Sequence, residues 1–372
     1  MKKIASIVGS IAILTSTFSP AFAAGNNCGN GTTGPISYNT CSVTNSSDVS
    51  VVNTNNATIN NNLTELSRSG GNSASMNTLG GSVVTGNASA HGTVSNVANV
   101  NTTTVSGGPA ASGNTGTNDV TGPESDNRVS INNSHRVAVA NINNANVSNV
   151  MSVTSDAGGN VADTNTGPAS IRTGNSSLQF VLENHLNDSA TGISAGAGGT
   201  GGNSGGNGTT GPISYNTVDV NNVATAGVSN INNLSLSNLM NTLSRSGANS
   251  ASTNTLGGEI VTGGAASSVG VNNEGNIATT TVQMALGGFS NVSGNDVTGP
   301  LSDNRTNLLN TLGINVANVN NNTANNVVND VADSGSNVSN MNTGGGSVTA
   351  GMSDLIKTLL NHFNDSLTVI QQ

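Results

Sequence analysis

The sequence predicts an all-β fold: a repetitive, parallel β-helix-like β-solenoid. Three observations favour it: a fixed repeat, strand-like alternation of apolar and polar residues, and a composition that cannot form a conventional core. Aromatic residues make up 2% of the 372 residues and Trp is absent. An ordered chain of this kind must stack short strands over a thin core of Val, Ile, Leu and Ala. β-Sandwich-like repeat modules are the alternative architecture.

Residues 1–23 are expected to form a signal peptide. Two lysines precede the mostly apolar stretch 4–14, and Ala21-Phe22-Ala23 supplies a small–x–small cleavage site. A retained membrane anchor is the alternative, but the apolar stretch is shorter than the roughly 18 residues that a spanning helix needs. We therefore expect a secreted, extracellular chain that starts near Ala24 and has no transmembrane segment after cleavage.

The charge pattern excludes one class of partner. Loss of the two leader lysines takes the formal charge from −9 to −11. An acidic chain cannot bind nucleic acid by neutralising phosphates, so no nucleic-acid partner is expected. Charged residues are only 7% of the chain, which argues against disorder driven by charge repulsion.

The repeat extends across the whole chain after the leader. The motif Thr-Gly-Pro-x-Ser-x-Asn recurs at spacings of 88, 89 and 88 residues, and two further markers keep these spacings. The best match is between residues 24–190 and 209–372, each holding two repeats of about 88, with the Gly-rich linker 191–208 between them. The motif begins at Thr33, Thr121, Thr210 and Thr298.

A finer unit of about 44 residues is also visible, because Thr166-Gly167-Pro168-Ala169-Ser170 resembles the motif at Thr33. If each such unit makes two coils, sixteen coils give a rod roughly 75 Å long at about 4.8 Å per coil. Alternation such as that of residues 137–143 predicts strands, and Gly, Asn, Asp and Pro mark the corners. Asparagines stacked between coils are expected to form amide ladders.

Two segments are more hydrophobic than the rest and are expected to be caps. Residues 355–363 place five apolar residues on one helical face, so this C-terminal cap is either helical or extended. Residues 178–186 would cap the first half of the chain.

Cys28 and Cys41 are the only cysteines. An even count in an exported chain suggests a disulfide, and free thiols are the alternative. The equivalent residues 177 positions later, Gly205 and Val218, lack both cysteines together, as expected of a bonded pair. The bridge would close a small loop at the mature N-terminus, where a repeat array needs a cap.

No catalytic site or cofactor is predicted. Glycine-rich strings that resemble a nucleophile elbow (202–206) and a dinucleotide fingerprint (196–201) lack the required strand–helix context. Calcium is the one candidate ion, because carboxylates beside the Thr-Gly-Pro turn are suitable oxygen ligands. The alternative role for these residues is in Asx-turns. The candidate ligands are Asp119, Asp126, Asp296 and Asp303.

A family resemblance adds to this interpretation. The strings Asn-Thr-Gly-Gly-Gly-Ser-Val-Thr (342–349), Thr-Gly-Asn-Ala-Ser-Ala (85–90) and Val-Ala-Asn-Val-Asn-Asn-Asn (316–322) resemble the Asn/Gly/Thr-rich β-strand repeat surface proteins of candidate-phyla-radiation (Patescibacteria) bacteria. The chain also resembles the head repeats of trimeric autotransporter adhesins. These resemblances imply a secreted surface protein.

Together these features predict a secreted, cell-surface structural or adhesive protein that is not an enzyme. Rows of Thr, Ser and Asn suit self-association, surface glycans or neighbouring cells through many weak contacts. The alternative is an extracellular module that binds glycans or another ligand. A flat ice-binding face would need one Thr row repeated in every coil, and the sequence does not predict such a row.

Overall fold

The computed structural model describes residues 3–8, 13–18, 25–106, 113–196, 202–285 and 291–371. Within these ranges all the regular secondary structure consists of β-strands. The strands pair in parallel with their equivalents one repeat away, so the predicted β-solenoid is confirmed and the sandwich is not formed. Each repeat of 88 or 89 residues makes one full coil. We call these coils 1 to 4, and they cover residues 25–106, 113–196, 202–285 and 291–371.

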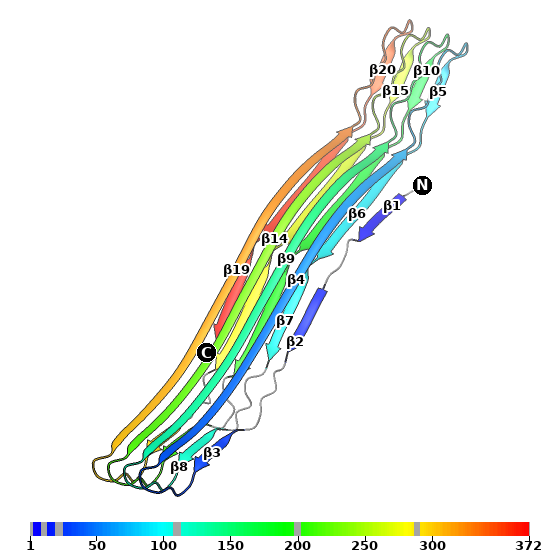
Figure 1. Ribbon diagram of the computed structural model, residues 1–372. Coiled ribbons are helices and arrows are strands. Elements are labelled where there is room, and N and C mark those ends of the chain that lie inside the picture. The colour runs from blue at the N-terminus through cyan, green and yellow to red at the C-terminus, as the bar shows by residue number, and fades with distance from the viewer. Residues whose placement is uncertain are drawn as a thin grey trace.

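One long strand forms the front of each coil (Figure 1). These four strands have 31 residues each and pair in the order β19-β14-β9-β4. At about 3.3 Å per residue they are roughly 100 Å long. Strands β4 and β9 contain neither Gly nor Pro, so nothing in them interrupts the alternation of buried and exposed residues. The long strands are β4 (Tyr38–Arg68), β9 (Asp126–Asp156), β14 (Tyr215–Arg245) and β19 (Asp303–Asp333).

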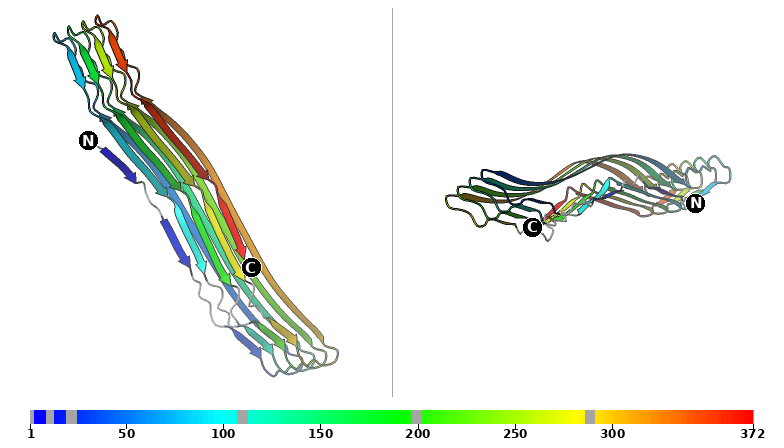
Figure 2. Two further views of the ribbon diagram at one scale, coloured as in Figure 1. Left: turned by 180° about the vertical axis from the view of Figure 1, so that it is seen from behind. Right: turned by 60° about the horizontal axis from the view of Figure 1, so that its bottom comes forward.

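Shorter strands return along the back of each coil (Figure 2). After the long strand come β5 (Gly81–Val84), β10 (Ala169–Arg172), β15 (Gly258–Val261) and β20 (Gly346–Thr349). The next sheet holds β6 (Ala88–Ala98), β11 (Ser176–Leu186), β16 (Ala265–Gly275) and β21 (Ser353–Phe363). It is followed by β7 (Val100–Ser106), β12 (Ser189–Gly196), β17 (Ala278–Ala285) and β22 (Ser366–Gln371). Each coil opens with β3 (Asn27–Asn30), β8 (Thr115–Asn118), β13 (Ser204–Asn207) or β18 (Val292–Asn295).

Two further strands lie beside coil 1. Strand β1 (Lys3–Val8) pairs with β6 and strand β2 (Ile13–Phe18) pairs with β7. Both belong to the expected leader, and the expected cleavage site at residues 21–24 lies outside the described residues. The Gly-rich stretch 191–208 contains most of β12 and all of β13, which pair with strands of the neighbouring coils.

The expected coil size was wrong. A unit of about 44 residues makes half a coil, not two coils, because it runs along one layer of the solenoid and the next unit returns along the other. The stack is therefore four coils deep, about 20 Å, and the long dimension of the molecule lies along its strands.

The core is a thin layer between the front and back sheets, and it divides into separate apolar clusters. One cluster packs Val137 and Val139 of β9 against Ile193 of β12, all at most 3% exposed. Another surrounds Phe180 of β11, whose ring fills the space left by Gly92 in the same column of coil 1. The predicted Val, Ile, Leu and Ala core is thus confirmed, with Met and one Phe added.

Ladders of buried asparagine separate these clusters, as the sequence predicted. The Nδ2 of Asn53 donates to the Oδ1 of Asn141 at 2.8 Å, and Asn141 donates to Asn230 at 2.8 Å. Asn230 in turn donates to Asn318 at 2.7 Å. Each amide uses its second N–H to reach a threonine of the back sheet, such as Thr191 from Asn141 at 2.8 Å. These buried amides are tolerated because the ladder supplies them with hydrogen-bond partners.

The Thr-Gly-Pro-x-Ser-x-Asn motif forms a closed network at one end of each coil. In coil 2 the Nδ2 of Asn127 donates to Thr121 Oγ1 and Ser125 Oγ at 3.0 Å each, and to Asn216 Oδ1 at 2.8 Å. The motif glycine is required because the coils are so close here. A Cβ on Gly122 would lie 2.4 Å from the backbone nitrogen of Pro35.

The residue after each motif proline has a left-handed backbone, with φ between 57° and 63°. These residues are Ile36, Glu124, Ile213 and Leu301 rather than the Asn or Gly expected at corners. Asparagine does occupy the corner between the two middle back strands. There Asn99, Asn187, Asn276 and Asn364 have φ between 56° and 66° and stack as another ladder.

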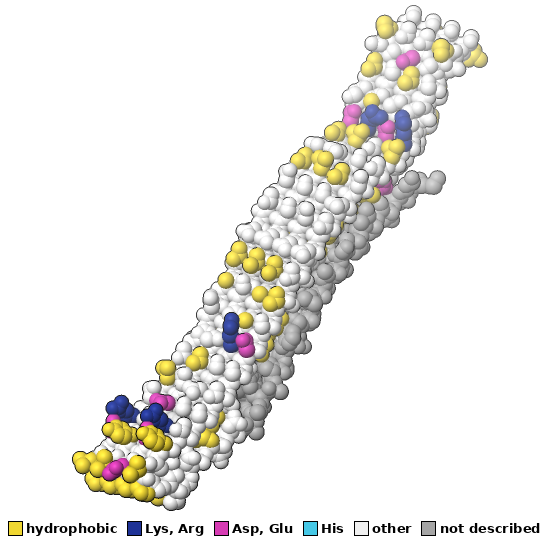
Figure 3. All heavy atoms as spheres, in the orientation of Figure 1, with side chains coloured by type: hydrophobic (Ala, Val, Ile, Leu, Met, Phe, Trp, Pro, Cys, Tyr) yellow, Lys and Arg dark blue, Asp and Glu magenta, His cyan; other side chains and the backbone are white. Residues whose placement is uncertain are grey.

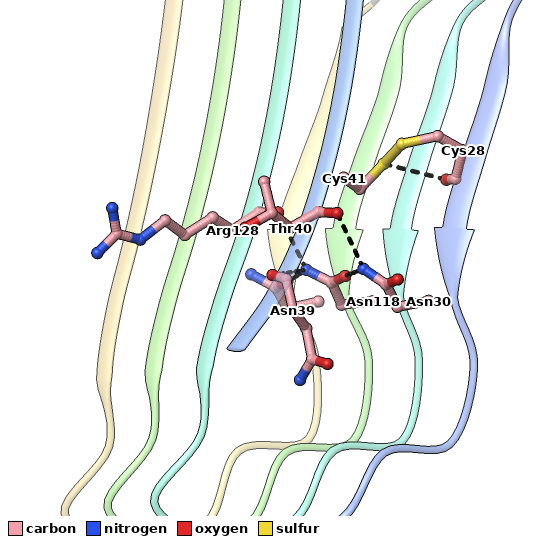
Figure 4. The surroundings of a disulfide bond; sticks show 8 residues. Cys28, Asn30, Asn39, Thr40, Cys41, Asn118 and Arg128 are labelled. Carbon is pink, nitrogen blue, oxygen red and sulfur yellow. Dashed lines mark hydrogen bonds between the residues drawn. A yellow bond between two sulfur atoms is a disulfide. The ribbon is translucent and has the colours of Figure 1, made fainter. Parts of the chain in front are cut away.

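The predicted disulfide joins Cys28 of β3 to Cys41 of β4, with their Cα atoms 5.8 Å apart (Figure 4). It closes the core at one end of coil 1. In coil 2 the same columns hold Gly116 and Val129, and a Cβ on this glycine would lie 2.7 Å from the valine. The bridge in coil 1 thus replaces a glycine–valine contact.

Of the two expected caps, the segment at residues 355–363 is extended rather than helical, because it lies within β21. The segment at 178–186 is not a cap. It lies within β11, between β6 and β16 in the middle of the stack, and its Leu178, Leu182 and Leu186 are at most 2% exposed.

Candidate functional surfaces

The calcium candidates lie around the turn that opens each long strand. Asp119 directly follows β8 and Asp296 follows β18, whereas Asp126 and Asp303 begin β9 and β19. Arg128 donates to both carboxylate oxygens of Asp126 at 2.9 and 2.7 Å. Hydrogen bonding to Asp126 raises the pKa of Arg128. Among the described residues no group of three or more His, Cys, Asp or Glu side chains is placed to hold a metal ion.

The same turn carries a pattern with a period of two coils. The first column of the long strands reads Tyr38, Asp126, Tyr215, Asp303 from coil 1 to coil 4. The column two residues on has Thr in coils 1 and 3, and Arg128 or Arg305 in coils 2 and 4. A shallow cavity of about 480 Å³ lies beside Tyr38 and Tyr215, which are 85% and 62% exposed.

Opposite charges alternate in the last column of the long strands, which reads Arg68, Asp156, Arg245, Asp333. Arg245 donates to both oxygens of Asp156, at 3.1 and 2.8 Å. Arg68 lies 3.6 Å from the same carboxylate. These bonds and the charge of Asp333 raise the pKa of Arg245. Figure 3 shows that charged side chains gather at a few places on this otherwise uncharged face.

A cluster of histidine and acidic residues lies on the back of the solenoid. His185 lies 2.5 Å from Asp188 and 3.1 Å from Glu274, and His362 lies 2.7 Å from Asp365. The hydrogen bond to Asp188, with a further contribution from Glu274, raises the pKa of His185 to about 9 against the opposing effect of burial. His185 and His362 occupy equivalent positions 177 residues apart in the sequence, but their carboxylate partners became visible only in the fold.

The structure reveals a threonine row that the sequence did not predict. Thr103, Thr191, Thr280 and Thr368 form one column through all four coils. They point into the core, where each accepts a hydrogen bond from an asparagine of the facing sheet. The outward threonines beside them do not recur in every coil, so this row is part of the core and not an ice-binding face.

An open groove of about 750 Å³ crosses all four coils near the middle of the long strands. Asparagine rows line it, and the amides of Asn56, Asn144, Asn233 and Asn321 are joined by 2.8 Å hydrogen bonds. Amides of this kind both donate and accept hydrogen bonds, which suits hydroxyl-rich ligands. The groove is therefore a candidate ligand surface.

No family model, curated protein or solved structure matches this chain. The fold itself defines a wide, flat parallel β-solenoid. Within the described ranges no helix is long and apolar enough to cross a bilayer.

Proposed function

We propose that the protein is a secreted structural or adhesive component of a cell surface. The observation that carries this proposal is repetition: a side chain on one coil has a counterpart about 4.8 Å away on the next, so a weak contact is offered several times in a row. The leader-like N-terminus supports export, and the resemblance to Asn/Gly/Thr-rich surface repeat proteins supports a surface location.

The construction of the molecule suits a mechanical role. Backbone ladders and amide ladders hold the coils together, and most of the core depends on contacts between coils. A disulfide in coil 1 adds a covalent restraint that persists outside the cell. A slab about 100 Å long with a largely uncharged polar face is well suited to spacing or joining surfaces.

Glycan binding is the second candidate function, and the amide-lined groove is the observation that favours it. Its rows of Asn side chains repeat across four coils and present alternating donors and acceptors. A chain of sugars lying along the rows would make the same contact in each coil.

The test is to locate the protein in the cells that produce it, by fractionation and by labelling intact cells. Adhesion and clumping are then compared in cells with and without the gene. Surface labelling together with reduced adhesion or an altered envelope on deletion is the expected result. A protein confined to the cytoplasm contradicts the proposal. Saturable binding of a soluble polysaccharide, abolished by Asn144→Leu, would favour the glycan-binding alternative.

A further inference from the structure

We propose that copies of this chain stack head to tail, with coil 4 of one copy docking in register on coil 1 of the next to make a continuous solenoid. The inference deepens the proposed surface role by naming a second copy of the chain as the partner. Three independent features of the two ends support it: the direction of the amide ladders, the alternation of charge, and the two-coil period.

The core amide ladders run in one direction. Interior rungs such as Asn141 donate once across the core and once toward coil 4. The last rung, Asn318, donates across the core to Thr368, and its second N–H faces the open end of the described stack. At the other end the first rung, Asn53, donates into the stack and leaves its oxygen facing outward.

The same direction holds in other core columns, where Asn61 donates to Asn149, Asn149 to Asn238, and Asn238 to Asn326. In these core columns coil 4 therefore ends in N–H donors and coil 1 begins with carbonyl acceptors, whereas the outer groove ladder from Asn321 to Asn56 donates toward coil 1. These ends fit each other and neither fits a copy of itself. Head-to-tail docking continues each ladder, whereas docking of two equal ends opposes like groups.

The alternating charge column gives the same orientation. It begins with Arg68 in coil 1 and ends with Asp333 in coil 4. In-register stacking places Asp333 of one copy beside Arg68 of the next and extends the alternation without a break. Docking of two equal ends requires a two-fold axis, which either reverses the facing strands or exchanges the front and back sheets, so the charge column would not be continued.

The two-coil period makes the new junction resemble one that already exists. Coil 2 carries Asp126 and Arg128 next to Tyr215 and a threonine of coil 3. Coil 4 carries Asp303 and Arg305 in the same places, and coil 1 of the next copy would bring Tyr38 and a threonine. On this face the junction between copies repeats the coil 2–coil 3 interface within the chain.

Coil 4 also leaves apolar surface uncovered. Leu359 is 51% exposed, although Leu182 and Val271 in the same column are at most 2% exposed. Its 31-residue edge strand β19 presents backbone groups suited to pairing with another strand. These features are those of an interface that a further coil would complete.

Two features restrain the stacking. Strands β1 and β2 of the leader cover the edges of β6 and β7 in coil 1, so the full junction requires their removal. In-register stacking also brings the core-facing Asp330 of coil 4 beside Glu65 of the next copy, with Lys357 on the facing strand. Inward charges weaken edge pairing, which makes the junction weaker than the interfaces within the chain.

The experiment uses the full chain produced by export, with its N-terminus read by mass spectrometry, and an uncleaved form as comparison. The test variant is Asn318→Asp with Asn326→Asp. It keeps the acceptors for coil 3 and removes the amide donors, both those toward the next copy and those across the core to Thr368 and Asn361. The control, Asn315→Asp with Asn325→Asp, adds the same charge to exposed positions of the same strand. Circular dichroism checks that each variant is folded.

The cleaved wild type and the control are expected to form ribbons that grow across the strands, roughly 100 Å wide, with an axial repeat of about 20 Å per copy. The uncleaved chain and the test variant should stay dispersed, with the critical concentration raised about tenfold or more. A dispersed cleaved wild type, or equal assembly of both variants, overturns the stacking. Surface labelling of cells reports separately on the proposed function, because a dispersed protein can still be retained at the surface.

Discussion

The loss of unfolding free energy on breaking one amide ladder shows most directly how much the ladders contribute to holding the coils together. Asn141 is fully buried, donates to Asn230 and Thr191, and accepts from Asn53 at 2.8 Å. The substitution Asn141→Ala leaves one N–H of Asn53 and the Oδ1 of Asn230 without their ladder partners inside the core. Each of these two groups costs about 1–3 kcal/mol, so we expect a loss of about 2–6 kcal/mol in the free energy of unfolding.

Removing the whole column should cost far less than removing one rung, because no donor or acceptor is then left alone. We expect replacement of the four ladder asparagines and their four threonine partners by Val to change the free energy of unfolding by less than about 2 kcal/mol. The replaced residues are Asn53, Asn141, Asn230, Asn318, Thr103, Thr191, Thr280 and Thr368.

Urea unfolding followed by circular dichroism measures both effects, with the exposed Asn315→Ala as a control expected to change stability by less than about 0.5 kcal/mol. A cost below about 1 kcal/mol for Asn141→Ala would refute the reasoning. A full-column variant that loses several times the single-rung cost would refute it as well.

Three further predictions concern other parts of the molecule. Gly122→Ala places a Cβ 2.4 Å from Pro35 N and should lower the free energy of unfolding by about 3 kcal/mol or more in urea titrations. The control Gly227→Ala has no atom within 4 Å of its new Cβ and should leave the stability nearly unchanged. Replacing Cys28 by Gly and Cys41 by Val recreates the contact of coil 2; it should keep the fold but cost about 2–4 kcal/mol, with faster hydrogen exchange confined to coil 1. The pKa of His185 is raised from 6.5 to about 9 in the folded protein. Its contribution to stability is therefore complete below pH 6.5 and is lost as the pH rises through 9. The stability of the His185→Gln variant should fall less over that pH range.

The sequence was sufficient to predict the fold class, the amide ladders and the disulfide, because each depends on repetition. Residues in register must stack on their own copies, and Asn on Asn satisfies both partners. The two cysteines could be paired because their counterparts Gly205 and Val218 form a different contact that needs both changes together.

The coil size was not predictable in the same way. A coil with two layers has a turn at each end, so turn residues recur about every 44 residues although the coil itself has 88 or 89. The Thr-Gly-Pro motif at Thr33 lies at one end of the coil. The pair Asn77-Thr78, which recurs at the same spacings of 88, 89 and 88 residues, lies at the other end. Strands usually have 3–10 residues, so the alternating pattern predicted short strands and not one strand of 31 residues. Surface features with a two-coil period, such as the Arg68–Asp333 column, became visible only when the register was known.

Spin labels at Asn60 and Ser148 test directly whether each layer of the stack is one full repeat. These outward positions are register partners in β4 and β9, about 5 Å apart. Labels at Asn60 and Thr104, 44 residues apart, lie on opposite outer faces of the two sheets, more than about 10 Å apart. Strong spin–spin broadening for the first pair and none for the second is the predicted result, and broadening for the second pair alone would contradict the fold described above.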